Sequence, residues 1–449
     1  MKHTLQRSFL PVLILIVFVT SSCLKGTKVD NVVPVVVTSD VVIDAANKIS
    51  WSGGTVTTAA AITTCGICYS SSNSNPTTAD TKTADTITNY TYTSKITGIT
   101  PGSTYYVRAY ASTAGTTAYG ETIKVVVPAD ISATYGTVST LAGSSTEGFT
   151  DGSGPAALFN KPAGITTDAA GNIYIADSFN SAIRKATPAG IVTTYAGNGQ
   201  VGYVDGSLTQ AQFYAASSQV FDSNGNLFVA DKGNNLIRKI TPAGVVSTFA
   251  GNGSAGYANG TGTSASFNTP AAIAIDGSNN LYVADYGNNT IRKITSAGVV
   301  TAYAGSGVAG YINGDVSTAQ FNKPNGIAVD AAGNVYVAEQ ANHAVRKITT
   351  DGIVTTYTGG AKNTKLLGSP SSLVIKSGVM YIADASGRIL SVNASNILQV
   401  LAGKYATSGF VNGNGSVALF SNPQGIAVGN TGIIYVSDSN NNQIRKITL

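Results

Sequence analysis

The chain has 449 residues, which is enough for two or three domains and a sizeable core. Charged residues make up only 11% of it, glycine occupies 50 positions, and 43% of the residues are hydrophobic. This composition excludes a disordered or collagen-like chain and favours short strands joined by tight turns. The net charge of +5 gives no reason to expect nucleic-acid binding, and the two histidines exclude mechanisms that need several of them.

The N-terminus has the layout of an export signal. After a short basic start, residues 9–19 are almost wholly apolar, which suits the core of a signal peptide but is too short to span a bilayer. The small residues before Cys23 resemble the bacterial lipoprotein box, which implies cleavage of residues 1–22, acylation of Cys23 and a linker over 23–31. Leu24 in place of aspartate favours an outer-membrane lipoprotein, facing the periplasm or the surface. An ordinary cleaved signal with a chance cysteine is the alternative.

Residues 32–128 alternate apolar and polar residues in short runs, which predicts a β-sandwich. The expected strands are 32–38, 49–56, 65–70, 90–96, 105–111 and 122–127. Trp51, the single tryptophan, is expected to anchor the core of this domain.

The stretch from Ile99 to Arg108, ITPGSTYYVR, resembles the turn before the sixth strand of a fibronectin type III domain. This resemblance implies that Tyr105 is the tyrosine corner, with its hydroxyl bonded back to the backbone upstream. Tyr105, Val107 and Ala109 then share the inward face, because side chains alternate along a strand.

Cys65 and Cys68 form a C-x-x-C pair, which could indicate a redox or zinc site. On a strand, however, residues three apart point to opposite faces with Cα atoms roughly 10 Å apart, farther than a disulfide reaches. No second pair of cysteines or histidines exists to complete a zinc site. We therefore expect two buried, small hydrophobic side chains.

From residue 136 the chain is an array of repeats, preceded by a linker over 129–135. A carboxylate residue ends an N-[IL]-[YF]-[IV]-A-D run, or a variant of it, at Asp177, Asp231, Asp285, Glu339, Asp384 and Asp438. A glycine recurs in the same register at Gly143, Gly197, Gly251, Gly305, Gly359 and Gly403. The spacing is 54 residues except for one interval of 45 or 44. Two markers in one register indicate one supersecondary unit used six times.

Each unit contains four candidate strands joined by hairpin turns, which predicts a β-propeller blade. The last unit ends after its third strand, and an orphan strand over 138–143 precedes the first unit. Pairing of that orphan strand with the last unit would remove a free sheet edge. We therefore predict an all-β chain with a six-bladed propeller over 136–449, closed by three strands plus one.

The repeats resemble the NHL repeat family, as from Pro324 to Ile348, where PNGIAVD is followed by GNVYVAE and VRKI. The resemblance covers residues 136–449 and implies the propeller fold. Members of the family include enzymes, peptide and RNA binders and cell-envelope proteins, so the resemblance leaves the function open.

The carboxylate that ends each second strand is expected to be structural, because every blade has one and it can accept N–H bonds across the following turn. These residues are Asp177, Asp231, Asp285, Asp384 and Asp438. Arg-Lys pairs recur in the third strands, where neighbours point to opposite faces. We expect both basic residues on solvated blade surfaces, and binding of an anionic polysaccharide by them is the alternative.

In a four-stranded blade, the turn between strands two and three lies on the same face as the loop between blades, here called the upper face. Tyr203, Tyr257 and Tyr311 collect there next to asparagine and aspartate residues. Aromatic rings that stack on sugars and amides that bond hydroxyls suit glycan binding. The regular repetition of these residues equally suits packing between blades, and both interpretations stay open.

The repeat breaks in its fourth and fifth units, and a unique ligand site is expected where it breaks. The loop over 359–367 is shortened, Glu339 replaces aspartate, and His343 replaces asparagine or serine. These changes predict a notch in the upper rim. The residues expected to line it are Glu339, Gln340, His343, Lys362 and Lys365. Gln219 replaces an inner-strand isoleucine and is expected to face or flank the central channel, and simple drift of one blade is the alternative.

These observations predict a monomeric, non-catalytic lipoprotein of the cell envelope whose upper face binds a glycan or a protein. No catalytic residue, metal ligand, cofactor or nucleic-acid partner is expected, and the membrane is contacted only through the lipid. Related propellers include metal-dependent lactonases and an amidating lyase, so an enzyme is one alternative. Its metal would be calcium, bound by carboxylates and amides in the central channel. A pure assembly scaffold is the other.

Overall fold

The computed structural model describes residues 33–38, 42–44, 49–58, 60–88, 91–127, 135–360, 367–394 and 397–449. The predicted signal peptide, Cys23, Lys362, Lys365 and the side chain of Trp51 lie outside this description. Within it, no helix has the length and apolar character of a bilayer span.

The N-terminal strands form two antiparallel sheets around one core. One sheet contains β1 (Val35–Thr38), β2 (Val42–Asp44), β3 (Ile49–Thr57) and β6 (Thr91–Ile96). The other contains β4 (Thr64–Ser70), β5 (Thr81–Lys82), β7 (Thr104–Ser112), β8 (Thr117–Tyr119) and β9 (Ile123–Val126). Val56, Ile67 and Val107 meet in a core to which both sheets contribute, because alternate residues of each strand face inward.

Tyr105 adopts the geometry that the sequence predicts. Its hydroxyl accepts a hydrogen bond from the Thr100 N–H at 3.1 Å and lies 3.5 Å from the Gly98 carbonyl. Val107 and Ala109 are buried in the same core. The bonds back to residues 98 and 100 fix the approach of the chain to β7.

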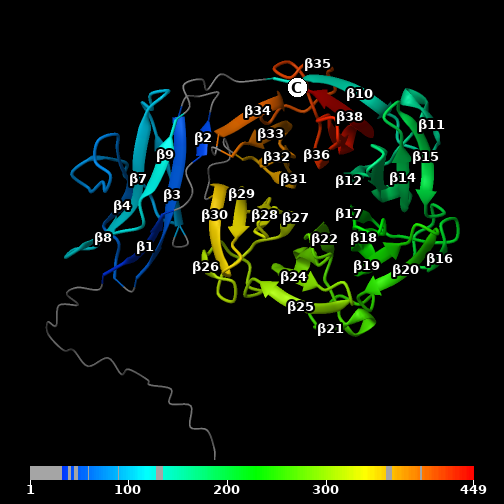
Figure 1. Ribbon diagram of the computed structural model, residues 1–449, viewed down its shortest axis with the longest axis horizontal. Coiled ribbons are helices and arrows are strands. Elements are labelled where there is room, and N and C mark those ends of the chain that lie inside the picture. The colour runs from blue at the N-terminus through cyan, green and yellow to red at the C-terminus, as the bar shows by residue number, and fades with distance from the viewer. Residues whose placement is uncertain are drawn as a thin grey trace, which may run out of the picture.

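The repeat region consists of sheets with one shared topology, here called blades, arranged around a common centre (Figure 1). From the inner to the outer strand, the blades are β12–β15 (Pro162–Thr167, Ile173–Asp177, Ala182–Ala186, Ile191–Ala196), β17–β20 (Ala216–Phe221, Leu227–Asp231, Leu236–Ile240, Val245–Ala250), β22–β25 (Pro270–Ile275, Leu281–Asp285, Thr290–Ile294, Val299–Ala304), β27–β30 (Pro324–Val329, Val335–Glu339, Ala344–Ile348, Ile353–Gly359), β31–β34 (Pro370–Lys376, Val379–Asp384, Arg388–Val392, Ile397–Gly403) and β36–β38 with β10 (Pro423–Val428, Ile434–Asp438, Gln443–Thr448, Thr137–Gly143).

A fifth, two-residue strand from the loop between blades pairs with the outer strand of most blades. These strands are β11 (Gly152–Ser153), β16 (Gly206–Ser207), β21 (Gly260–Thr261), β26 (Gly314–Asp315) and β35 (Gly413–Asn414). Short 3-10 turns follow several second strands and two of the short strands. They are η1 (Gly154–Ala156), η2 (Ser178–Asn180), η3 (Lys232–Asn234), η4 (Gly262–Ser264), η5 (Tyr286–Asn288) and η6 (Ser439–Asn441). The second strand of a blade is buried on both faces, as in β13, because neighbouring blades pack against each side of it.

The two ends of the repeat region meet in one sheet. β10 pairs antiparallel with β38, from Thr137 opposite Thr448 to Gly143 opposite Gln443 (Figure 1). This is the pairing that the orphan strand predicts. It covers a sheet edge that would otherwise be free.

The N-terminal domain and the repeat region also share a sheet. β2 runs parallel to β34, with Ile43 opposite Ile397 and Asp44 opposite Leu398 (Figure 1). The side chain of Ile397 belongs to the core of the N-terminal domain. The sequence did not predict this contact, which fixes the domain on the outer strand of one blade.

Candidate functional site

The upper face has the arrangement expected for a blade, because its turns bond to the loops between blades. Asn180 of η2 donates a hydrogen bond to the Gly148 carbonyl at 2.7 Å, and Asn234 of η3 donates one to Gly202 at 2.7 Å. The turn between strands two and three therefore lies against the loop that precedes the blade. This contact brings the candidate residues of both segments to one face.

The repeated carboxylate pairs with a buried arginine in every blade. In the first blade, Asp177 accepts hydrogen bonds from Arg184 at 2.8 Å, from Asn180 at 2.8 Å and from the Asn160 N–H at 2.8 Å. The other pairs are Asp231–Arg238 (3.0 Å), Asp285–Arg292 (3.1 Å), Glu339–Arg346 (3.0 Å), Asp384–Arg388 (2.6 Å) and Asp438–Arg445 (2.7 Å). The expectation that these arginines are solvated is wrong: those in the third strand of the regular blades are fully buried between adjoining blades.

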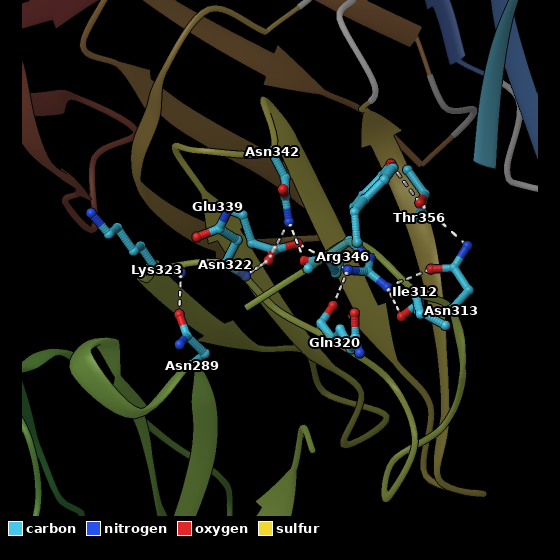
Figure 2. A network of polar contacts seen from close by, with 12 residues as sticks. Asn289, Ile312, Asn313, Gln320, Asn322, Lys323, Glu339, Asn342, Arg346 and Thr356 are labelled. Atoms are coloured by element: carbon cyan, nitrogen blue, oxygen red, sulfur yellow. Dashed lines mark hydrogen bonds and ion pairs between the residues drawn. The ribbon is translucent and has the colours of Figure 1, made fainter. Parts of the chain in front are cut away.

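Figure 2 shows the polar shell of one such arginine. One terminal nitrogen of Arg346 donates to Glu339 at 3.0 Å and to the Gln320 carbonyl at 2.9 Å. The other donates to the Ile312 carbonyl at 2.8 Å and to Asn313 Oδ1 at 2.6 Å. Four of its five N–H groups are thus bonded, which a lysine could not reproduce.

Aromatic rings complete the shell of each guanidinium. The Arg346 guanidinium lies 4.8 Å from the ring centre of Tyr311 and 5.3 Å from that of Phe321. Tyr257 covers Arg292 in the same way at 4.5 Å. Loop aromatic residues such as Tyr257 and Tyr311 therefore pack on buried arginines, and this packing accounts for much of their repetition.

The rims of the blades nevertheless differ in exposure. Tyr203 and Tyr257 are exposed at the surface, whereas Tyr311 is only 7% exposed. The Tyr311 hydroxyl is 2.8 Å from Thr356 Oγ1, and the adjacent Asn313 donates to Thr55 Oγ1 of β3 at 2.8 Å. The N-terminal domain thus contacts the rim at this blade, so Tyr311 is not open to a ligand.

The shortened loop between the fourth and fifth blades coincides with the attachment of the N-terminal domain. In other blades the loop supplies a short strand, as where Ser207 lies opposite Val245 of the outer strand. At the matching position of β34, the partner of Ile397 is Ile43 of β2. On β34, a strand of the N-terminal domain therefore occupies the position that a short loop strand takes on the outer strands of other blades.

The residues of the predicted notch do not come together in an open site among the described residues. Glu339 is fully buried and accepts bonds from Arg346, Asn342 and the Asn322 N–H, and burial raises its pKa. His343 takes the left-handed turn position, with φ of 53°, and its Nδ1 contacts the Gly368 carbonyl. Gln340 opens the same turn, and its carbonyl accepts the His343 N–H at 3.3 Å.

The described residues enclose a central cavity of about 920 Å³. It is lined by the inner strands β12, β17, β22, β27, β31 and β36 and by upper-face turns. Its mouth on the upper face includes Lys161, Phe179, Tyr214, Lys232 and Asn440. Hydroxyl and amide groups, including Ser217, Asn325, Ser371 and Gln424, line the upper part of the strands. Their lower ends are lined mainly by aliphatic residues.

The mouth carries positive charge. Lys161 and Lys232 are the charged residues among the described cavity lining, which contains no carboxylate or histidine. Lys161 donates to Asn440 Oδ1 at 3.3 Å. The Lys232 amino group lies 4.9 Å from the ring centre of Tyr286, and burial lowers its pKa. Sequence reasoning missed both lysines, because the only signal was a basic residue at turn positions that are neutral in several other blades.

Gln219 lines the cavity from β17, as the sequence predicts. Its Nε2 donates to the Tyr174 carbonyl at 2.7 Å and to the Gly164 carbonyl at 3.1 Å, both in the neighbouring blade. The two carbonyls fix the orientation of the amide, because neither can donate to an oxygen. Its buried Oε1 has no hydrogen-bond partner among the described residues.

The two described cysteines are free and buried on β4. Burial raises the pKa of Cys65 to about 11 and that of Cys68 to about 12, so neither is a reactive thiolate at neutral pH. Cys65 belongs to the core, consistent with the prediction of small buried side chains. Across the described part of the chain, no three His, Cys, Asp or Glu residues are grouped closely enough to hold a metal ion.

Comparisons with known proteins identify the repeat. The NHL repeat family matches residues 267–294, 321–348 and 420–447. "Protein SUPPRESSOR OF QUENCHING 1, chloroplastic" of Arabidopsis thaliana is 40% identical over 94 residues, which are 21% of this chain and 9% of that protein. "NHL repeat-containing protein 2" of Bos taurus is 26% identical over 337 residues, 64% of this chain and 46% of that protein. The chain thus spans less than half the length of these curated relatives.

A solved structure shares the fold over nearly the whole chain. It is a structural genomics protein of unknown function from Bacteroides thetaiotaomicron VPI-5482, 16% identical, with a TM-score of 0.56. The likeness covers 92% of this chain and 98% of that one, so it reaches beyond the repeat region into the N-terminal domain. This chain therefore carries NHL repeats in a propeller-type all-β fold.

Proposed function

We propose that this protein is a cell-envelope binding protein that captures a glycan at the upper mouth of its central cavity. In this proposal residues 1–22 are removed, Cys23 is acylated, and the chain is held at the outer membrane by lipid. Residues 32–128 form a fibronectin type III-like domain, and residues 136–449 form a closed six-bladed propeller of the NHL type.

The composition of the cavity wall carries the proposal. Exposed Phe179 and Tyr214 offer ring faces at the mouth, and Ser217, Asn325 and Gln424 offer hydroxyl and amide groups just inside it. Sugars present both kinds of partner surface, C–H faces and hydroxyls. A volume of about 920 Å³ accommodates an oligosaccharide rather than a single water or ion.

The same wall favours binding over catalysis. Among the described lining residues there is no carboxylate and no histidine, the groups that most often act as general acids and bases. The carboxylates that end the second strands, such as Asp177, are buried and bonded to arginine. The side chains that face the cavity therefore suit recognition of a ligand.

Thermal unfolding of the chain with a panel of neutral and acidic oligosaccharides tests this function. A ligand present at 100 times its Kd stabilises the protein by about 2.7 kcal/mol, which raises the Tm measurably. Tyr214→Ala at the mouth should abolish the shift, and Tyr203→Ala at the outer rim should preserve it. If the Tm shift is lost in Tyr203→Ala and kept in Tyr214→Ala, the binding site lies at the rim instead. If no saccharide raises the Tm, glycan binding is rejected.

A further inference from the structure

We propose that the ligand of the cavity mouth is an anionic saccharide, whose carboxylate or sulfate groups are met by Lys161 and Lys232. This inference rests on the proposed glycan binding and adds the charge of the glycan. It is carried by the position of the two lysines, by their surroundings and by the other groups at the mouth.

The two lysines face the mouth from adjacent blades without a matching acid. Both belong to the cavity lining, and no described carboxylate forms an ion pair with either. Asp177 and Asp231, which end the second strands of the same two blades, are already neutralised by Arg184 and Arg238 at 2.8 and 3.0 Å. The positive charge of the mouth is therefore left for a ligand.

The lysines are not part of what every blade needs. Lys161 occupies the left-handed turn position, φ 50°, that Ala215 and Thr269 occupy in the next two blades and Lys323 in the one after. Lys232 begins a 3-10 turn that Ser178 begins in the preceding blade. Because neutral residues serve the fold equally well at these positions, the charges need another explanation. An ammonium group that is partly withdrawn from water, as that of Lys232 is, gains most from an anionic partner.

The remaining groups at the mouth point to a saccharide rather than a bare anion. Phe179 and Tyr214 are exposed beside the lysines and offer ring faces that an inorganic ion would not use. Gln219 adds a buried acceptor oxygen without a partner on the same wall, which a ligand hydroxyl could bond. Anionic groups, sugar faces and hydroxyl donors occur together in an acidic oligosaccharide.

Calorimetric titration of the full chain with matched ligand pairs tests the inference. Hexagalacturonate is compared with its methyl ester, and dextran sulfate with dextran, since each pair differs in charge and shares its sugar chain. We expect the charged member of at least one pair to bind at least tenfold more tightly at 50 mM salt, and the difference to shrink at 500 mM salt. The pair that shows the difference tells carboxylate from sulfate recognition.

Lysine variants locate the interaction. Lys161→Met with Lys232→Met should lower the affinity for the charged ligand at least tenfold. Lys185→Met with Lys239→Met, from the third strands of the same two blades, is the matched control and should leave it unchanged. Equal losses in both double variants would show non-specific attraction of a polyanion and overturn the inference. Unchanged Tm values in the absence of ligand establish that all variants are folded.

The two proposals fail in different ways. If neutral and charged members bind equally, glycan capture stands and the anionic preference is overturned. If no saccharide binds a protein that still unfolds cooperatively, the proposed function itself fails, and the inference fails with it.

Discussion

The attachment of the N-terminal domain to the propeller can be tested with two isoleucines at one repeat position. Ile397 and Ile191 each open the outer strand of a blade, and Ile→Ala removes the same atoms from both. Ile397 is 5% exposed and lies in the core of the N-terminal domain, whereas Ile191 is 50% exposed. A buried Ile→Ala substitution costs about 2–5 kcal/mol, and a half-exposed one about 1 kcal/mol or less. We expect Ile397→Ala to lose about 2–3 kcal/mol more than Ile191→Ala.

Urea unfolding with two probes measures this difference. Trp51, the single tryptophan, lies on β3, so its fluorescence reports on the N-terminal domain, while far-UV circular dichroism reports mainly on the larger repeat region. In the unchanged protein the shared sheet should make the two transitions coincide. Ile397→Ala should lower the fluorescence midpoint and separate the transitions, and Ile191→Ala should do neither. Equal effects of the two substitutions, or unchanged midpoints with Ile397→Ala, would refute the docked arrangement.

Three further predictions concern the buried groups. Arg238→Met leaves Asp231 as an unpaired buried charge and should lower the free energy of unfolding in urea by about 3–5 kcal/mol. The control substitution Lys239→Met should change it by about 0.5 kcal/mol or less. Similar losses in the two variants would contradict the buried ion pair. Burial raises the pKa of Asp231 to about 6, so the native state binds more protons than the unfolded state between about pH 4 and 6. The stability of the protein therefore falls as the pH rises through this window. Asp231→Asn should flatten this part of the plot of Tm against pH. The pKa of Asp384 is lowered, so its contribution to stability is instead lost as the pH falls below about 4. If the Tm changes with pH in the opposite directions, the pKa shifts of both Asp231 and Asp384 are contradicted. Gln219→Ile removes the unpaired oxygen together with the two hydrogen bonds that Nε2 donates to the Tyr174 and Gly164 carbonyls, so it should lower the free energy of unfolding by about 1 kcal/mol and weaken saccharide binding. Unchanged saccharide affinity would contradict a contact between this side chain and the ligand.

The regular part of the fold could be predicted because each blade repeats the same local signals. The interval of 54 residues recurs in two independent markers, and hairpin turns mark the strands within each interval. The pairing of β10 with β38 followed from counting strands at the two ends of the array. Contacts of this kind need no information beyond the repeat.

The contact between β2 and β34 could not be predicted in that way. β2 has only three residues, Val42–Asp44, and its partner strand lies some 350 positions later in the chain, so no periodicity links them. The sequence did mark the place, because the loop after Gly359 is shortened where the N-terminal domain attaches. The break in the repeat predicts a ligand notch, whereas the structure places a domain contact beside it.

The arginines show where strand alternation stops being sufficient. Alternation predicts that Arg238 and Lys239 point to opposite faces, but a blade has neighbours on both sides, so either face can be buried. The constant interval of seven residues from Asp231 to Arg238 was the available signal for an ion pair. In the irregular blade Arg388 pairs with Asp384 from only four residues away. The ion pair persists while its position changes, which indicates that the fold requires the pair itself.

These buried pairs also connect the framework of the propeller to the proposed ligand site. Asp177 holds the Asn160 N–H at 2.8 Å, and the next residue, Lys161, donates its own N–H to Asn442 Oδ1 of the neighbouring blade at 3.0 Å. The backbone of Lys161 is therefore fixed between two blades. Its conformational entropy is already low before a ligand binds, so binding costs little further entropy there. The N-terminal domain attaches at the outer strand β34, while the described cavity lining comes from inner strands and upper turns. One edge of the propeller thus carries the N-terminal domain, while the cavity mouth, where we propose that a glycan binds, is built from other strands and turns.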